Sequence, residues 1–141
     1  MNTRTFTRTI GWVMLLMGLF ALIPQFSTVP EWLPRLKLET SYGLFVNLFP
    51  MNIINKLALL AFGVAGIWVA LPRNPIELNV RYSKTLFAVM AIAALLGIYR
   101  PMNTLLGYWP LFGAEIWLHT VFAGLGAYFG YREKVKKPVR I

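Results

Sequence analysis

The sequence has no cysteine and only one histidine among its 141 residues. The lack of cysteine excludes disulfides, thiolate metal sites, iron–sulfur clusters and cysteine nucleophiles. A single histidine excludes a zinc site of the HExxH type, and no Walker A, GxGxxG or GxSxG motif occurs. We therefore expect a protein that is not an enzyme and that has no metal site.

Charged residues are also scarce, at 13% of the chain, whereas apolar residues make up 57%. About a quarter of the residues of a soluble domain are charged. The apolar residues gather in four stretches, and with their flanks these predict membrane spans at about 5–26, 52–71, 84–100 and 115–131. The sequence thus predicts a single domain with an all-α fold, an integral membrane four-helix bundle.

The basic residues are distributed unevenly between the connections. Ten of the 14 would lie on one side of the membrane: Arg4, Arg8, Arg73, Arg81, Lys84, Arg132, Lys134, Lys136, Lys137 and Arg140. The positive-inside rule then places both termini in the cytoplasm, at a bacterial plasma membrane or an internal photosynthetic membrane. We expect the basic tail at 132–141 to meet anionic lipid, and we expect no nucleic-acid partner.

The outer loop at 25–43 is the longest connection. It contains Pro30 and Pro34, with apolar residues such as Trp32 alternating with charged ones such as Arg35. This pattern predicts a segment that lies on the bilayer surface.

The chain reads as two copies of one unit, each made of a helix, an outer loop, an aromatic–proline element and a second helix. Leu48-Phe49-Pro50 in the first copy matches Tyr108-Trp109-Pro110 in the second. Each copy contains two spans, so the two repeats would be parallel and related by an axis near the membrane normal.

Small residues at one-turn spacing let helix backbones approach closely. They predict helix packing at Ala61, Ala65, Ala93, Gly97, Ala123, Gly126 and Gly130. Such a face serves either the internal packing of the bundle or contact with another subunit or a second copy.

The motifs of both halves resemble a known family. Pro50-Met51-Asn52, Asn55-Lys56-Leu57 and the pair Gly63 and Gly66 are similar to the first half of the domain of unknown function 4383 family. Leu106-Gly107-Tyr108-Trp109-Pro110, Trp117-Leu118-His119 and Gly124 are similar to its second half. The resemblance implies a small bacterial four-helix membrane protein and no activity. It also leads us to expect a histidine in each half, but Ala58 stands at the first of these positions.

His119 is the most informative polar residue. Together with Glu115 it lies on the small-residue face of the last helix, four residues apart, so the two form an expected interhelix polar pair. His119 could make a structural hydrogen bond between helices, act as an axial ligand to haem or chlorophyll, or take part in a proton relay. Lys56, near the start of its helix, is expected to snorkel to the membrane surface.

Three functions remain open on this basis. The first is a non-catalytic accessory or stabilising subunit of a larger membrane complex, in contact with lipid and with other subunits or itself. The second is a pigment- or haem-binding subunit of a photosynthetic or respiratory assembly, with His119 as ligand. The third is a small oligomeric transporter or channel.

Overall fold

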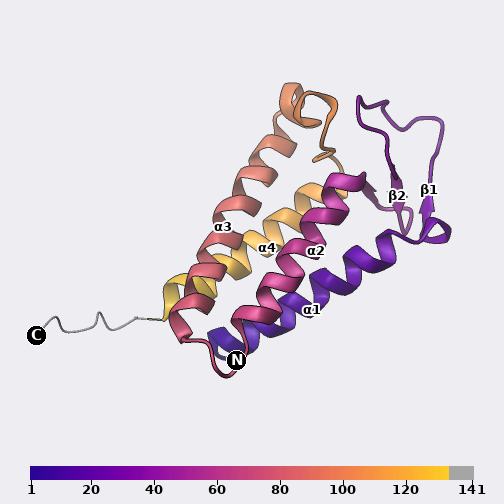
Figure 1. Cartoon of the computed structure of the whole chain (residues 1–141). Coiled ribbons are helices and arrows are strands. Elements are labelled where there is room, and N and C mark those ends of the chain that lie inside the picture. Colours follow the sequence, from indigo (N-terminus) through magenta and orange to yellow (C-terminus); the bar gives the residue numbers. More distant parts are fainter. Residues whose placement is uncertain (134–141) are drawn as a thin grey trace, which may run out of the picture.

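The computed structural model describes residues 1–133, so most of the predicted tail at 132–141 lies outside the described residues. The chain is mostly helical with a small sheet (Figure 1). Its elements, in order, are α1 (Thr3–Ala21), η1 (Pro24–Phe26), β1 (Ser27–Thr28), β2 (Gly43–Phe45), β3 (Phe49–Met51), α2 (Ile53–Val69), α3 (Ile76–Ile98), η2 (Arg100–Met102), η3 (Leu105–Gly107) and α4 (Ala114–Arg132). The prediction of a helical fold is confirmed.

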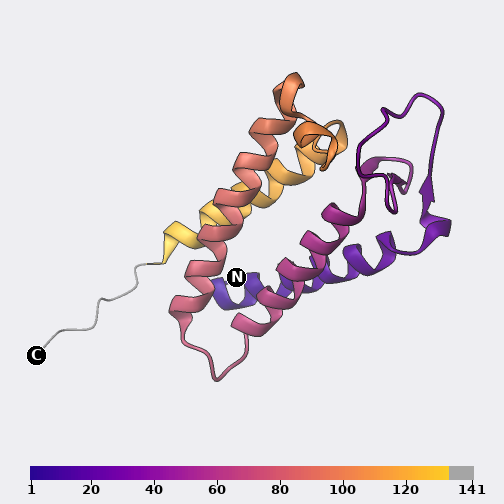
Figure 2. The same cartoon turned by 45° about the horizontal axis from the view of Figure 1, so that its top comes forward.

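The four long helices form two antiparallel pairs, α1 with α2 and α3 with α4. Figures 1 and 2 show both pairs running between the same two ends of the molecule. The terminal end carries the N-terminus and the α2–α3 connection at 70–75. The loop end carries the sheet and the α3–α4 connection at 99–113. Each predicted repeat therefore corresponds to one helix pair.

Glycines allow the helices of each pair to touch backbone to backbone. A Cβ on Gly63 of α2 would lie 2.5 Å from the backbone nitrogen of Leu15 in α1. A Cβ on Gly126 of α4 would lie 2.8 Å from the backbone nitrogen of Phe87 in α3. Both separations are too short for any side chain, so the pairs depend on glycine at these positions.

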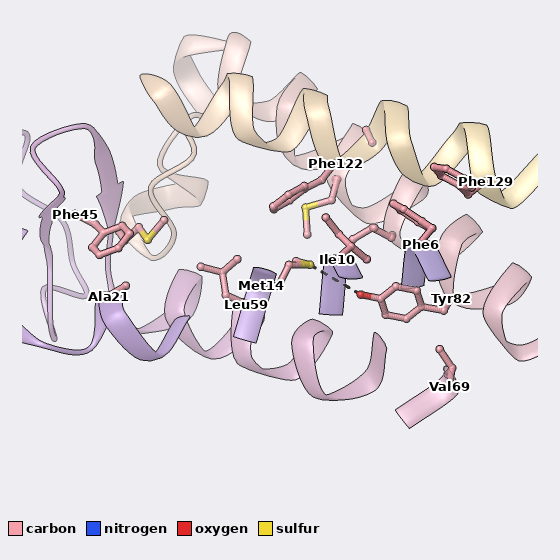
Figure 3. Close-up of a cluster of buried hydrophobic side chains, with 14 residues drawn as sticks. Phe6, Ile10, Met14, Ala21, Phe45, Leu59, Val69, Tyr82, Phe122 and Phe129 are labelled. Atoms are coloured by element: carbon pink, nitrogen blue, oxygen red, sulfur yellow. Dashed lines mark hydrogen bonds between the residues drawn. The ribbon is translucent and has the colours of Figure 1, made fainter. Parts of the chain in front are cut away.

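The core lies where the two pairs meet (Figure 3). Phe6 of α1 stacks on Phe129 of α4 with ring centroids 4.3 Å apart. Met14 is fully buried in the same cluster, and the Tyr82 hydroxyl donates to the Phe62 carbonyl at 2.9 Å. These contacts join the first helix pair to the second.

The sheet was not predicted. β2 pairs antiparallel with both β1 and β3, so the predicted outer loop at 25–43 contains β1 and the connection from β1 to β2 in a three-stranded sheet. Val46 and Asn47 have positive φ angles of 48° and 60° and turn the chain between β2 and β3. Strands of two or three residues are too short to leave an alternating pattern in the sequence.

Two helix boundaries also differ from the predicted spans. α1 ends at Ala21, five residues before the predicted end at 26, and Pro24 follows in a 3-10 turn. α3 begins at Ile76 rather than 84, directly after Pro75 in an extended conformation. Proline is well suited to a helix start, where a missing backbone N–H costs nothing, and Pro75 in its extended conformation caps α3 even though polar residues follow.

Candidate functional site

A buried polar cluster lies at the loop end, where α2 and α4 begin beneath the connections. Its four core members are Asn52, which caps α2, Asn55 of α2, and Glu115 and His119 of α4, and none exposes more than 6% of its surface. Polar groups buried this deeply must find partners inside the protein. The partners come from both repeats.

Asn52 and Asn55 form a capping box at the start of α2. The Asn52 side chain accepts from the Ile54 amide at 3.0 Å, and the Asn55 side chain accepts from the Asn52 amide at 3.0 Å. Reciprocal caps of this kind satisfy the free amides of a first turn. The local sequence therefore fixes both side chains at the helix terminus.

The same two asparagines reach across to the second repeat. Asn52 Nδ2 donates to the carbonyl of Tyr108 at 2.7 Å, and Asn55 Nδ2 donates to the carbonyl of Pro110 at 3.0 Å. Tyr108 and Pro110 flank Trp109 in the aromatic–proline element. The start of α2 thus holds the element that precedes α4, and we call this set of contacts the inter-repeat clamp.

Glu115 and His119 meet one turn apart on α4. His119 Nε2 lies 3.3 Å from Glu115 Oε2, and Asn55 Nδ2 donates to the same oxygen at 3.1 Å. The structure therefore brings together the two polar residues that the helical spacing placed on one face, and it adds Asn55 as their link to α2.

Lys56 does not snorkel outward as predicted. Its residue is 2% exposed, and its amine donates to both the carbonyl and the hydroxyl of Ser41 at 2.7 Å. Ser41 belongs to the loop that leads into β2. The amine is therefore satisfied by the folded loop, and Lys56 ties that loop to the start of α2.

A small cavity adjoins the cluster. The volume within which the centre of a water molecule can lie is about 20 Å³. Residues of α2, α3 and α4, together with Trp109, line the cavity. The polar lining residues are Asn55, Trp109, Glu115 and His119. Ala58, the position at which the family resemblance suggested a histidine, lines the same cavity opposite α4.

This geometry bears on the predicted haem or chlorophyll ligand. Nε2 of His119 already lies against Glu115, and the adjoining space is far smaller than a tetrapyrrole ring. Nδ1 of His119 has no hydrogen-bond partner among residues 1–133, but ligation through it would require the helices around the cavity to separate and admit the ring. The arrangement fits hydrogen bonding by His119 and does not fit a macrocycle.

Among residues 1–133, no group of three or more histidine, cysteine or acidic side chains is placed to hold a metal ion.

A second buried polar cluster lies at the terminal end, and it was not predicted from the sequence. The Thr7 hydroxyl of α1 bonds to Asn79 Oδ1 of α3, and Asn79 Nδ2 donates to the Val69 carbonyl of α2 at 2.9 Å. The Thr3 hydroxyl donates to the Phe129 carbonyl of α4 at 3.2 Å. Side chains thus join all four helices at this end.

The predicted packing residues fall into two groups. Those buried between helices of the chain are Ala93, Gly97, Ala123, Gly126 and Gly130. Ala61 is exposed and Ala65 is half-buried, and both line an open apolar groove between α2 and α3. The Ala61 and Ala65 pair therefore offers a small-residue surface to the outside.

Sequence reasoning missed the two asparagines of the clamp. The available signal was asparagine at both ends of Asn52-Ile53-Ile54-Asn55, directly before a long apolar run, which is the spacing of a capping box. Nothing in the sequence indicated that their amides would also bind the second repeat.

A family model described as Domain of unknown function (DUF4383) matches residues 4–132. No curated protein and no solved structure matches the chain.

Proposed function

We propose that this chain, which belongs to the family described as Domain of unknown function (DUF4383), is a four-span integral membrane protein that acts as a non-catalytic accessory or stabilising subunit. In this arrangement both termini face the cytoplasm and the loop end faces the opposite side. The observation that carries the proposal is the distribution of polar and apolar side chains over the helices.

Large apolar side chains point outward on all four helices. They include Phe20 at 49% exposure on α1, Val64 at 57% on α2, Leu95 at 67% on α3 and Trp117 at 74% on α4. Meanwhile asparagine, glutamate, histidine and lysine side chains are buried inside the protein. Exposed apolar surface of this extent marks contact with lipid or protein, and helices that face lipid keep their polar groups inside.

The helix lengths agree with a bilayer. Within residues 1–133, α3 is the helix that is both long and apolar enough to cross a membrane on its own, and α2 is a shorter apolar helix. α1 and α4 contain 19 residues each. At about 1.5 Å per residue they span about 28 Å, close to the hydrocarbon thickness of about 30 Å.

The groove between α2 and α3 supports an accessory role. It measures about 370 Å³, and most of its lining side chains are apolar or small; Arg81, Tyr82 and Thr85 contribute the polar groups. Ala61 and Ala65, four residues apart, would let the backbone of a partner helix approach closely. We therefore infer that a transmembrane helix of another subunit, or of a second copy, docks here.

The absence of cysteine makes this proposal directly testable. Ala61→Cys introduces a unique thiol in the groove, and Val64→Cys introduces one on the neighbouring exposed face of α2. After crosslinking in native membranes, we expect Ala61→Cys to give a discrete adduct with one membrane protein or a dimer. Val64→Cys should give little crosslinked product. Recovery of the protein in the soluble fraction would overturn the membrane assignment. Equal, diffuse crosslinking from both positions would overturn the docking role.

A further inference from the structure

The cavity beside the inter-repeat clamp contains an unusual concentration of unpaired polar atoms. Trp109 Nε1, Glu115 Oε1 and His119 Nδ1 are each buried without a hydrogen-bond partner among residues 1–133. All three residues line the same small cavity. Unpaired buried polar atoms are rare in proteins, and three of them on residues that line one cavity point to a ligand that satisfies them together.

The size of the cavity limits that ligand. The space open to the centre of a water molecule is about 20 Å³, and a single ordered water needs about 10–15 Å³ by this measure. The remaining lining is apolar, from residues such as Ala58, Leu59, Val89 and Met90. The cavity accommodates one water and has no room for a larger polar molecule.

The chemistry of the three groups points to the same ligand. The indole of Trp109 is a donor only. The Glu115 and His119 side chains lie 3.3 Å apart in a site that strongly disfavours net charge, so the pair is expected to carry one proton between them. When that proton lies between Oε2 and Nε2, Nδ1 of His119 bears a hydrogen and Oε1 of Glu115 is free to accept.

A ligand at this place must therefore accept two hydrogen bonds and donate one. Water does so, and buried waters typically make about three hydrogen bonds. A cation would face the donor hydrogens of the indole and the imidazole, and an anion would face the Glu115 carboxyl group. An apolar ligand would leave all three groups unpaired.

We propose that this cavity is a binding site for a single structural water, which bridges Trp109 Nε1, Glu115 Oε1 and His119 Nδ1. The water lies within the second repeat, next to the inter-repeat clamp, and joins the aromatic–proline element that carries Trp109 to the first turns of α4. The proposal depends on the cavity alone and holds whichever partner the outer surface binds.

Nuclear magnetic resonance on the full-length, ¹⁵N-labelled protein in micelles of chain-deuterated detergent tests this site. The chain has five tryptophans, and Trp109→Phe identifies the indole signal of Trp109 by its loss. We expect that signal to show water cross-peaks of opposite sign in NOESY and ROESY spectra. This pattern marks a bound water, whereas hydrogen exchange with bulk solvent gives cross-peaks of the same sign.

Space-filling variants supply the control. Ala58→Leu fills the cavity and should abolish the water cross-peak; Val89→Ile, a smaller change on α3, should weaken it if Ala58→Leu does not fold. Ala61→Leu makes the same substitution about one turn along α2, in the open groove, and should leave the cross-peak intact. A wild-type indole with no water contact, or with exchange peaks only, would overturn the proposal. So would a water cross-peak that survives both filling variants.

Discussion

Gly11 of α1 and Gly66 of α2 touch backbone to backbone. A Cβ on Gly66 would lie 2.9 Å from the Cα of Gly11 and equally close to the Thr7 carbonyl oxygen. The Tyr82 hydroxyl, from the other helix pair, would lie at 2.8 Å. One glycine therefore serves both the packing inside the first pair and the contact between the two pairs.

Gly66→Ala should destabilise the protein. The added methyl group meets backbone atoms that cannot rotate away, so the α1–α2 pair must separate, at a cost of about 1–3 kcal/mol. The free energy of unfolding in detergent, followed by loss of helical circular dichroism, measures this change.

Gly124→Ala is the matched control. No heavy atom of the described residues would lie within 4 Å of a Cβ at Gly124. Because alanine favours the helix over glycine by about 1 kcal/mol, this variant should be unchanged or slightly more stable. Equal destabilisation by both substitutions would show that glycine is needed here for reasons other than close packing.

Lys56→Met should loosen the first outer loop while leaving the helices intact. The variant keeps the length of the side chain and removes the donor to Ser41, so the loop loses an anchor. Hydrogen exchange of the amides at 38–42 is expected to accelerate. Lys37→Met is the control, because the Lys37 amine lies exposed over the Tyr108 ring at 5.6 Å. Unchanged exchange in Lys56→Met would argue against the anchoring role.

These results show which features a sequence can reveal. The helices were predictable because long apolar runs are a local signal, and the Glu115–His119 contact was predictable because it joins residues one helical turn apart. Lys56 was misread because its partner, Ser41, is 15 residues away in a loop whose path depends on the sheet. The inter-repeat clamp escaped prediction for the same reason, since Asn52 and the Tyr108 carbonyl are 56 residues apart.

Tyr42 should make the protein sensitive to alkali. Partial burial, and secondarily the nearby Glu39 carboxylate, raise the pKa of the Tyr42 phenol from 10.0 to about 12. The phenol donates to the Pro34 carbonyl at 2.9 Å. Since the folded-state pKa is raised, the stability that Tyr42 contributes is complete below pH 10 and is lost as the pH rises toward 12.

Tyr42→Phe is therefore expected to be less stable than the wild type at pH 8 and to lose less stability between pH 10 and 12. Unfolding curves of both proteins across this range measure the difference. If the stability of both proteins falls equally between pH 10 and 12, groups other than Tyr42 cause the loss of stability in alkali.

The strongest test of the inter-repeat clamp is a double-mutant cycle on Asn55 and Glu115. Asn55 Nδ2 donates to Glu115 Oε2 at 3.1 Å and to the Pro110 carbonyl at 3.0 Å, so each single substitution removes a buried partner. Asn55→Ala and Glu115→Ala should each lower the free energy of unfolding, and their combined effect should be smaller than the sum. Contacting residues couple by about 0.5–3 kcal/mol, whereas hydrogen bonds between membrane helices average about 0.6 kcal/mol. We expect a coupling of about 1 kcal/mol.

A cycle of Asn55→Ala with Asn79→Ala, at the terminal end, provides the reference and should be additive within about 0.5 kcal/mol. If both cycles are additive, the first turns of α2 and α4 contribute independently to stability. The two repeats are then held together by the apolar core around Phe6 and Phe129 and by the polar cluster at the terminal end.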